Sequence, residues 1–165
     1  MSAAGDLPEL LRYNAWANTR VCETCAEADP RLLTMPAAGT IGTVLATIAH
    51  LTRMEEAYCA LLQEDSVSPM ESREAFESRD VAALGRRLTE LGATFQTWVE
   101  RAAPEDLARR LPITWLDFEV SAREALLQVL SHSAQHRSQI LSVLGGQGVE
   151  VPDLDYVLLL QQERV

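Results

Sequence analysis

Residues 121–146 read SAREALLQVLSHSAQHRSQILSVLGG, the pattern of a long helix with a marked beginning and a marked end. Ser121 and Glu124 have the spacing of a capping box, in which each side chain satisfies a free backbone amide at a helix N-terminus. The glycine pair 145–146 suits the left-handed conformation that ends many helices. We therefore expect a helix over residues 122–144.

Two of the chain's three histidines, His132 and His136, lie on this predicted helix, four residues apart. This spacing places both rings on one face, one turn above the other, where they can reach a single ion. Imidazole favours zinc, nickel, copper or iron(II) over magnesium or calcium. By itself the spacing is a modest signal, and ordinary packing is the alternative, with two core histidines whose rings bond backbone carbonyls. The third histidine, His50, lies in another predicted helix, and periodicity alone does not aim it at the pair.

The hydrophobic periodicity predicts three further long helices. They lie at residues 6–28, 40–63 and 80–102. Residues 65–78 have the polar composition of a loop, 109–119 the pattern of an irregular excursion or short hairpin, and 154–160 that of a short terminal segment. Four long helices without a strong strand signal indicate an all-α four-helix bundle that forms one domain over residues 1–165.

The charge of the chain excludes several partners and mechanisms. Its 165 residues carry 14 basic against 24 acidic side chains, a formal net charge of −10. Binding to nucleic acid or to an anionic membrane needs a concentrated basic patch, so neither partner is expected. Every basic residue is arginine, which excludes a P-loop lysine and a Schiff-base lysine. With no signal-peptide pattern and no membrane-spanning segment, we expect a cytoplasmic protein.

Sequence motifs for other enzyme chemistries are either absent or lie at an unsuitable place in a predicted helix. Cys22 and Cys25 form a C-x-x-C, but late in a predicted helix, whereas a redox pair uses the N-terminus of a helix to lower its thiol pKa. We interpret both thiols, and Cys59, as small apolar packing residues. No histidine stands three residues after a glutamate, and no G-x-S-x-G occurs, so di-iron and α/β-hydrolase patterns are absent.

Four segments along the chain occur in the same order in a known family. They are Tyr13-Asn14-Ala-Trp16-Ala17-Asn18 with Arg20, Ala49-His50 with Glu55 and Tyr58, His132-Ser-Ala-Gln-His136-Arg137-Ser-Gln139, and Gly148-Val-Glu-Val-Pro152-Asp153-Leu-Asp155-Tyr156. With these segments the chain resembles the DinB-like (DinB/YfiT) superfamily over nearly its whole length. Members of this superfamily are often described as DNA damage-inducible.

The resemblance implies a bundle of up-down-down-up topology, commonly a homodimer, with a divalent metal held by His50, His132 and His136. It also implies a small-molecule substrate. The metal would be zinc or nickel first, with iron and manganese as further candidates. Members with an assigned reaction are S-transferases and isomerases that use bacillithiol, mycothiol or glutathione, and some relatives are metal-dependent hydrolases. This sequence departs from the usual pattern at Gln135, where a second adjacent histidine is frequent, and at Ser138, where glycine is frequent.

On this basis we expect a cytoplasmic, homodimeric metalloprotein whose three-histidine site activates a low-molecular-weight thiol. Two alternatives stay open. One is a hydrolase with the same ligands, in which metal-bound hydroxide attacks an ester or amide. The other is a non-catalytic stress-response or binding bundle whose histidines only pack or hold a structural ion.

Several polar residues near the expected ligands have candidate roles. Glu55 is expected either to support a ligand from behind or to bond an arginine. Arg137 and Gln139 are expected to hold an anionic thiol or to fix a histidine ring, unless they are solvated helix residues. Three residues of the first predicted helix are expected to tie it to the bundle: Asn14, Trp16 and Asn18.

Overall fold

The structure is a computed structural model that describes residues 4–63 and 79–164. Its elements in chain order are α1 (Leu7–Glu27), α2 (Pro30–Thr34), α3 (Val44–Gln63), α5 (Val81–Arg101), α6 (Pro104–Ala108), β1 (Arg110–Ile113), β2 (Phe118–Ser121), α7 (Ala122–Gly146) and α8 (Tyr156–Gln162). The polar stretch 65–78, predicted as a loop, lies outside the described residues.

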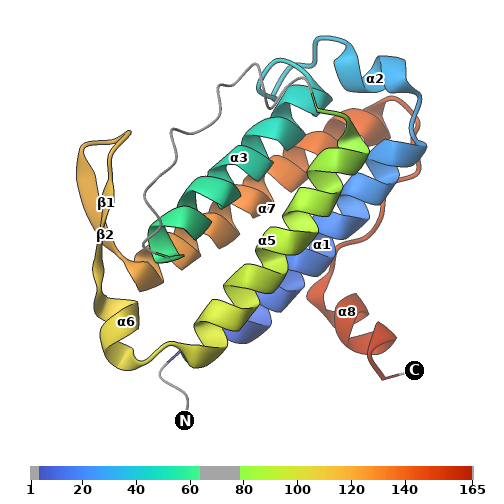
Figure 1. The fold of residues 1–165 in the computed structure, drawn as a ribbon. Coiled ribbons are helices and arrows are strands. Elements are labelled where there is room, and N and C mark those ends of the chain that lie inside the picture. The colour runs from blue at the N-terminus through green and yellow to red at the C-terminus, as the bar shows by residue number, and fades with distance from the viewer. Residues whose placement is uncertain (1–3, 64–78, 165) are drawn as a thin grey trace.

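Within residues 4–63 and 79–164, four long helices form the bundle. Helix α1 packs against α5 and α7, and α3 packs against the same two helices, so each long helix has two long neighbours. Figure 1 shows that α1 and α7 run in one direction and α3 and α5 in the other. The topology is therefore up-down-down-up, which confirms the predicted fold.

The core follows from the apolar stripes of these helices. In α5, Leu84, Leu88 and Phe95 recur at helical spacing, and each is at most 2% exposed. Close packing of α1 on α5 depends on Gly92, because a Cβ there would lie 2.8 Å from the Cβ of Ala15. A larger residue at this position would push the two helices apart.

The beginning of α3 differs from the prediction. The helix starts at Val44 and not at residue 40, because Gly42 has a φ of 99°, which an α-helix does not accommodate. The Thr43 hydroxyl then accepts a hydrogen bond from the amide of Ala46 at 3.0 Å and caps the helix. The short helix α2, which the prediction missed, is capped by the Asp29 side chain.

Helix α7 begins as predicted and ends later. The capping box is present, with the Glu124 amide donating to the Ser121 hydroxyl at 3.2 Å and the Ser121 amide to the Glu124 carboxylate at 2.6 Å. The predicted stop at the 145–146 glycine pair is wrong, since the helix includes both glycines. Its last turn continues until Gly148, which has the left-handed φ of 82°.

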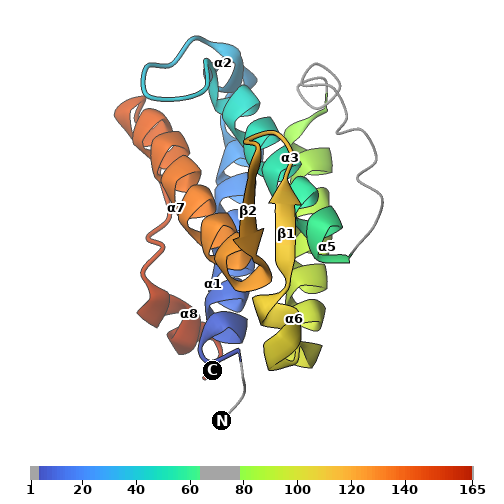
Figure 2. The same cartoon turned by 90° about the vertical axis from the view of Figure 1, so that its left-hand side faces the viewer.

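The segment before α7 is a hairpin. Strands β1 and β2 pair antiparallel, and Ile113 lies opposite Phe118 at the turn end. The hairpin contacts both α3 and α7 (Figure 2), and the Trp115 ring meets the Tyr58 ring of α3 edge-on at 5.6 Å. Pro104 is the first residue of the short helix α6, a position at which proline is favourable.

The last segment of the chain folds back onto α1. The Tyr13 hydroxyl donates to the Leu154 carbonyl at 2.7 Å, and the Trp16 indole donates to the Gln162 side chain at 3.0 Å. The predicted terminal segment is helical in part, as α8. Trp16 thus ties α1 to the C-terminal segment.

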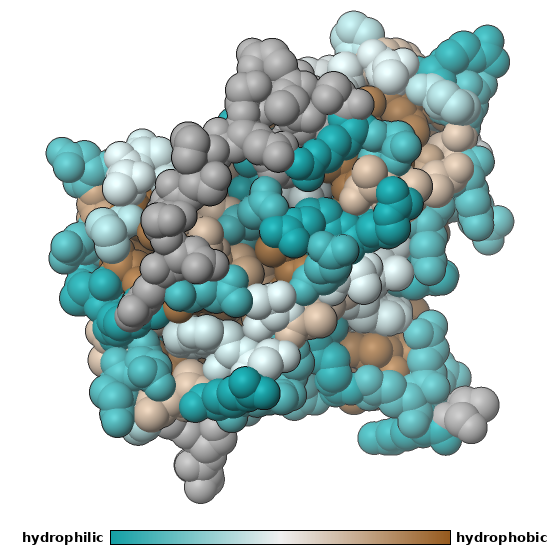
Figure 3. Space-filling model, in the orientation of Figure 1, coloured by the Kyte–Doolittle hydropathy of each residue, from teal (hydrophilic) through white to brown (hydrophobic). Residues whose placement is uncertain are grey.

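Hydrophilic residues cover much of the face seen in Figure 3, with hydrophobic residues mainly in the depressions between them. This distribution agrees with the acidic composition, because charged side chains remain in water while apolar ones are buried. None of the helices in the described ranges has the length and hydropathy that crossing a bilayer requires.

Candidate metal centre

The packing of α3 on α7 brings all three histidines together. His50 comes from α3, and His132 and His136 come from consecutive turns of α7. The Nε2 atom of His132 lies 3.1 Å from the Nε2 atoms of both His50 and His136, and one nitrogen from each ring lies within 4.8 Å of the others. Helical periodicity did not predict that His50 faces the other two histidines. The packing of α3 on α7 places it there.

Hydrogen bonding among the rings does not account for this arrangement. A neutral imidazole nitrogen carries either one hydrogen or one lone pair, so His132 Nε2 makes a hydrogen bond to only one of its two neighbours. A cation, by contrast, accepts a lone pair from each of the three rings. Two ligand nitrogens about 2.0–2.1 Å from a tetrahedral zinc are roughly 3.3 Å apart. The observed separations of 3.1 Å are close to this value, so the residues fit a divalent ion.

A neighbouring amide orients one of the rings. The Nδ1 atom of His136 lies 2.7 Å from Oε1 of Gln139, one turn further along α7. When Nδ1–H donates to this oxygen, a neutral His136 presents the lone pair of Nε2 to the cluster. Of the roles considered for Gln139, contact with a histidine ring is the one that the structure contains.

The environment keeps the His132 ring uncharged. Burial, together with the neighbouring His136 and His50, lowers the pKa of His132 from 6.5 to about 4. His132 is therefore neutral near pH 7. Neutral imidazole is the form that binds a metal ion.

A buried polar network lies behind the α7 histidines. Glu55, on α3, is 1% exposed and accepts hydrogen bonds from Asn14, Asn18 and Ser133. Burial raises the pKa of Glu55, although these three bonds and the charge of Arg137 oppose the shift. Arg137 is also buried and donates to both asparagines rather than to the carboxylate.

These contacts show how the residues expected near the ligands are paired. Arg137 is buried and is therefore not a solvated helix residue. The Glu55 carboxylate and the Arg137 guanidinium are linked through the side-chain amides of Asn14 and Asn18. Both asparagines join α1 to α3 and α7. Ser133 was not predicted as a site residue. In the sequence, the one indication of such a role is its position next to His132.

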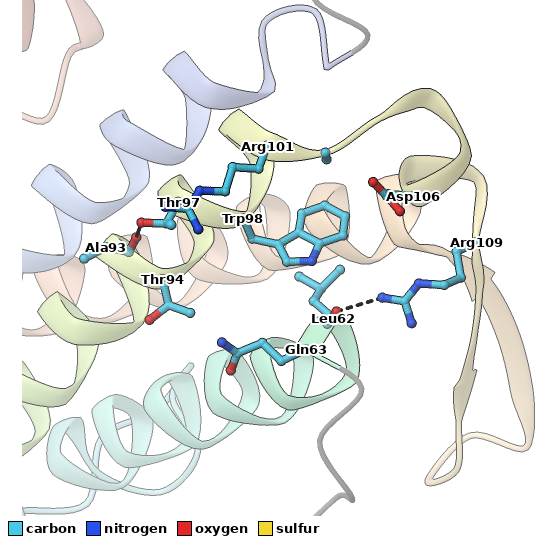
Figure 4. A pocket seen from close by; sticks show the side chains of 10 residues that line it. Leu62, Gln63, Ala93, Thr94, Thr97, Trp98, Arg101, Asp106 and Arg109 are labelled. Carbon is cyan, nitrogen blue, oxygen red and sulfur yellow. Dashed lines mark hydrogen bonds between the residues drawn. The ribbon is translucent and has the colours of Figure 1, made fainter.

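A cavity and a pair of cysteines lie outside the histidine cluster. A cavity of about 670 Å³ lies between the C-terminal ends of α3 and α5 and is lined by Trp98, Arg101 and Arg109, among others (Figure 4). Its α3 residue Leu62 is twelve positions from His50, about 18 Å along the helix. Cys22 and Cys25 are buried, and burial raises the pKa of each thiol to about 12, which supports the packing interpretation.

Comparisons with known proteins agree with the fold. The DinB family model matches residues 1–164. Among solved structures, YfiT from Bacillus subtilis superposes with a TM-score of 0.72 at 14% sequence identity, covering 87% of this chain and 89% of YfiT. That protein is described as "a probable metal-dependent hydrolase with an unusual four-helix bundle topology". No curated protein sequence matches the chain.

Proposed function

The chain belongs to the DinB family, and from this premise we propose that it is a metal-dependent enzyme whose ion is held by His50, His132 and His136. The observation that carries the proposal is the convergence of three ring nitrogens, two of them 3.1 Å from the third. Zinc and nickel are the first candidates, because three imidazoles suit a borderline transition metal.

A set of three histidine ligands would allow an external molecule to bind to the ion. Three neutral ligands leave at least one coordination position open, as in catalytic zinc sites. A divalent ion bound there supplies Lewis acidity: it lowers the pKa of a coordinated water to about 7 and deprotonates a coordinated thiol outright. The protein's own part is to keep the His132 ring neutral by burial and to orient the His136 ring through the Gln139 amide.

The composition of the cluster favours a thiol as the nucleophile. Within the described ranges, the group of converging ligand atoms consists of three histidines and includes no carboxylate. Beside an ion held by three neutral imidazoles, a thiol would be fully ionised near pH 7, whereas a water with a pKa of about 7 would be ionised only in part. The leading function is therefore a thiol-dependent S-transferase acting on small electrophiles. In such a transfer, the sulfur bonds to an electrophilic carbon, the leaving group departs with its electron pair, and the thiol proton passes to solvent.

A hydrolase is the second candidate, and the observation that favours it is the similarity to YfiT, described as a probable hydrolase. The two reactions differ in their need for a thiol. Product formation from glutathione and a chlorinated dinitrobenzene supports the transferase. Cleavage of a nitrophenyl ester without thiol supports the hydrolase. Neither activity in metal-loaded protein would favour a non-catalytic bundle.

Metal content is the first test of the proposal. Elemental analysis of protein purified without affinity tag or chelator should give about one transition-metal ion per chain. The His132→Ala/His136→Ala double variant should lose it, while Gln135→Ala, an exposed position between the two histidines, should retain it. A metal-free wild type that takes up neither zinc nor nickel would contradict the proposal. Analytical ultracentrifugation of the same samples tests the expected homodimer.

A further inference from the structure

Five buried polar side chains form one hydrogen-bonded unit between α1, α3 and α7. Its members are Asn14, Asn18, Glu55, Ser133 and Arg137, and each is at most 3% exposed. Buried polar groups are costly unless they are hydrogen-bonded, so bonds that join three helices restrict how these helices can pack, even though Oε2 of Glu55 has no partner among the described residues.

The bonds within this unit connect all three helices. Oε1 of Glu55 accepts from the Asn14 amide at 3.0 Å, from the Asn18 amide at 2.9 Å and from the Ser133 hydroxyl at 2.6 Å. The oxygens of the two asparagines accept from Nη1 of Arg137 at 2.6 Å and 2.7 Å. Each asparagine therefore bridges the carboxylate of α3 and the guanidinium of α7.

The α7 members of the unit lie next to the candidate metal ligands. Ser133 directly follows His132, and Arg137 directly follows His136. A shift of α7 along α3 by one residue is about 1.5 Å. Such a shift would break the 2.6 Å contact between Ser133 and Glu55, and it would also change the 3.1 Å separation of His132 from His50.

We propose that Asn14, Asn18, Glu55, Ser133 and Arg137 are positioning residues that set the register of α7 against α3 and thereby the spacing of the three histidine nitrogens. Helix α1 contributes no histidine to the cluster, but its asparagines hold the other two helices in register. The relevance of this spacing to metal binding rests on the proposed function. The positioning itself is a property of the metal-free protein.

Ser133→Ala is the sharpest variant because it removes one α3–α7 bond and leaves the charges of Glu55 and Arg137 in place. Cobalt(II) titrated into the metal-free protein reports both affinity and, through its visible absorption, ligand geometry. We expect Ser133→Ala to fold, to bind cobalt about 10- to 100-fold more weakly and to show an altered spectrum. Val99→Ala in α5 removes part of a residue that is 1% exposed and serves as the control. It should lower the melting temperature without changing affinity or spectrum.

A crystal structure of metal-free Ser133→Ala separates this proposal from the proposed function. Positioning predicts that the His50–His132 nitrogen separation increases from 3.1 Å, whether or not the wild type binds cobalt. An unchanged separation, with cobalt affinity equal to that of Val99→Ala, would overturn the proposal. If the wild type binds no cobalt, the proposed function fails, and the crystallographic separation alone decides whether the unit positions the rings.

Discussion

Replacing Gln139 with alanine should weaken metal binding without unfolding the protein. The hydrogen bond from His136 Nδ1 to Gln139 Oε1 is 2.7 Å long and keeps the lone pair of Nε2 directed at the other two rings. A hydrogen bond contributes about 0.5–1.5 kcal/mol, and the freed ring also regains rotation and its second tautomer. Loss of such a partner typically lowers metal affinity 10- to 100-fold, or about 1.4–2.7 kcal/mol.

A matched series on the same helix makes this test specific. Gln135→Ala makes the same chemical change at an exposed position four residues earlier on α7. Gln139→Glu keeps an acceptor for Nδ1–H and adds a negative charge, so its affinity should equal or exceed that of the wild type. Cobalt(II) competition against a chelator measures all three, and urea denaturation checks their stability. Equal affinities for Gln139→Ala and Gln135→Ala would refute the role of this hydrogen bond.

Three further predictions follow from burial and charge. In the metal-free protein, folded His132 stays neutral down to about pH 4, whereas unfolded histidine protonates near pH 6.5. The free energy of unfolding should therefore fall as the pH drops through this window, and His132→Gln should flatten the slope in urea titrations. Phe95→Ala should cost about 3–5 kcal/mol in the same assay, because this ring is 1% exposed. Cys22 and Cys25, with thiol pKa values raised to about 12, should react with a disulfide reagent only after unfolding.

The long helices were predictable because their apolar residues repeat with the helical period and their ends carry capping residues. Asp80 caps α5, which begins within one residue of the predicted start, and the capping box at Ser121 and Glu124 begins α7 as predicted. Apart from the missed helix α2, the errors lie where glycine conformation decides a boundary. Gly42 delays the start of α3, and Gly148 rather than the 145–146 pair ends the last turn of α7. A φ angle depends on the surrounding chain, and the letter G alone does not specify it.

The convergence of the histidines was only partly predictable. The four-residue spacing places His132 and His136 on one face of a helix, and this follows from helix geometry alone. The contact with His50 spans 82 positions and depends on which helices pack together, which periodicity does not determine. All three histidines were expected as metal ligands from the resemblance to the family. The packing of α3 on α7 brings their ring nitrogens together. Ser133 could not be singled out, because its role depends on a carboxylate from another helix.

The hydrogen bonds from Arg137 to α1 also have a consequence for synthesis of the protein. Asn14 is synthesised 123 positions before Arg137, its partner on α7. At 5–20 residues per second, the two are made roughly 6–25 s apart. His132 and His136 likewise follow His50 by 82 and 86 positions, so the complete cluster cannot form before this part of α7 has been synthesised. Binding of an ion by all three ligands would therefore have to follow the synthesis of α7, when α1 and α3 have already been made.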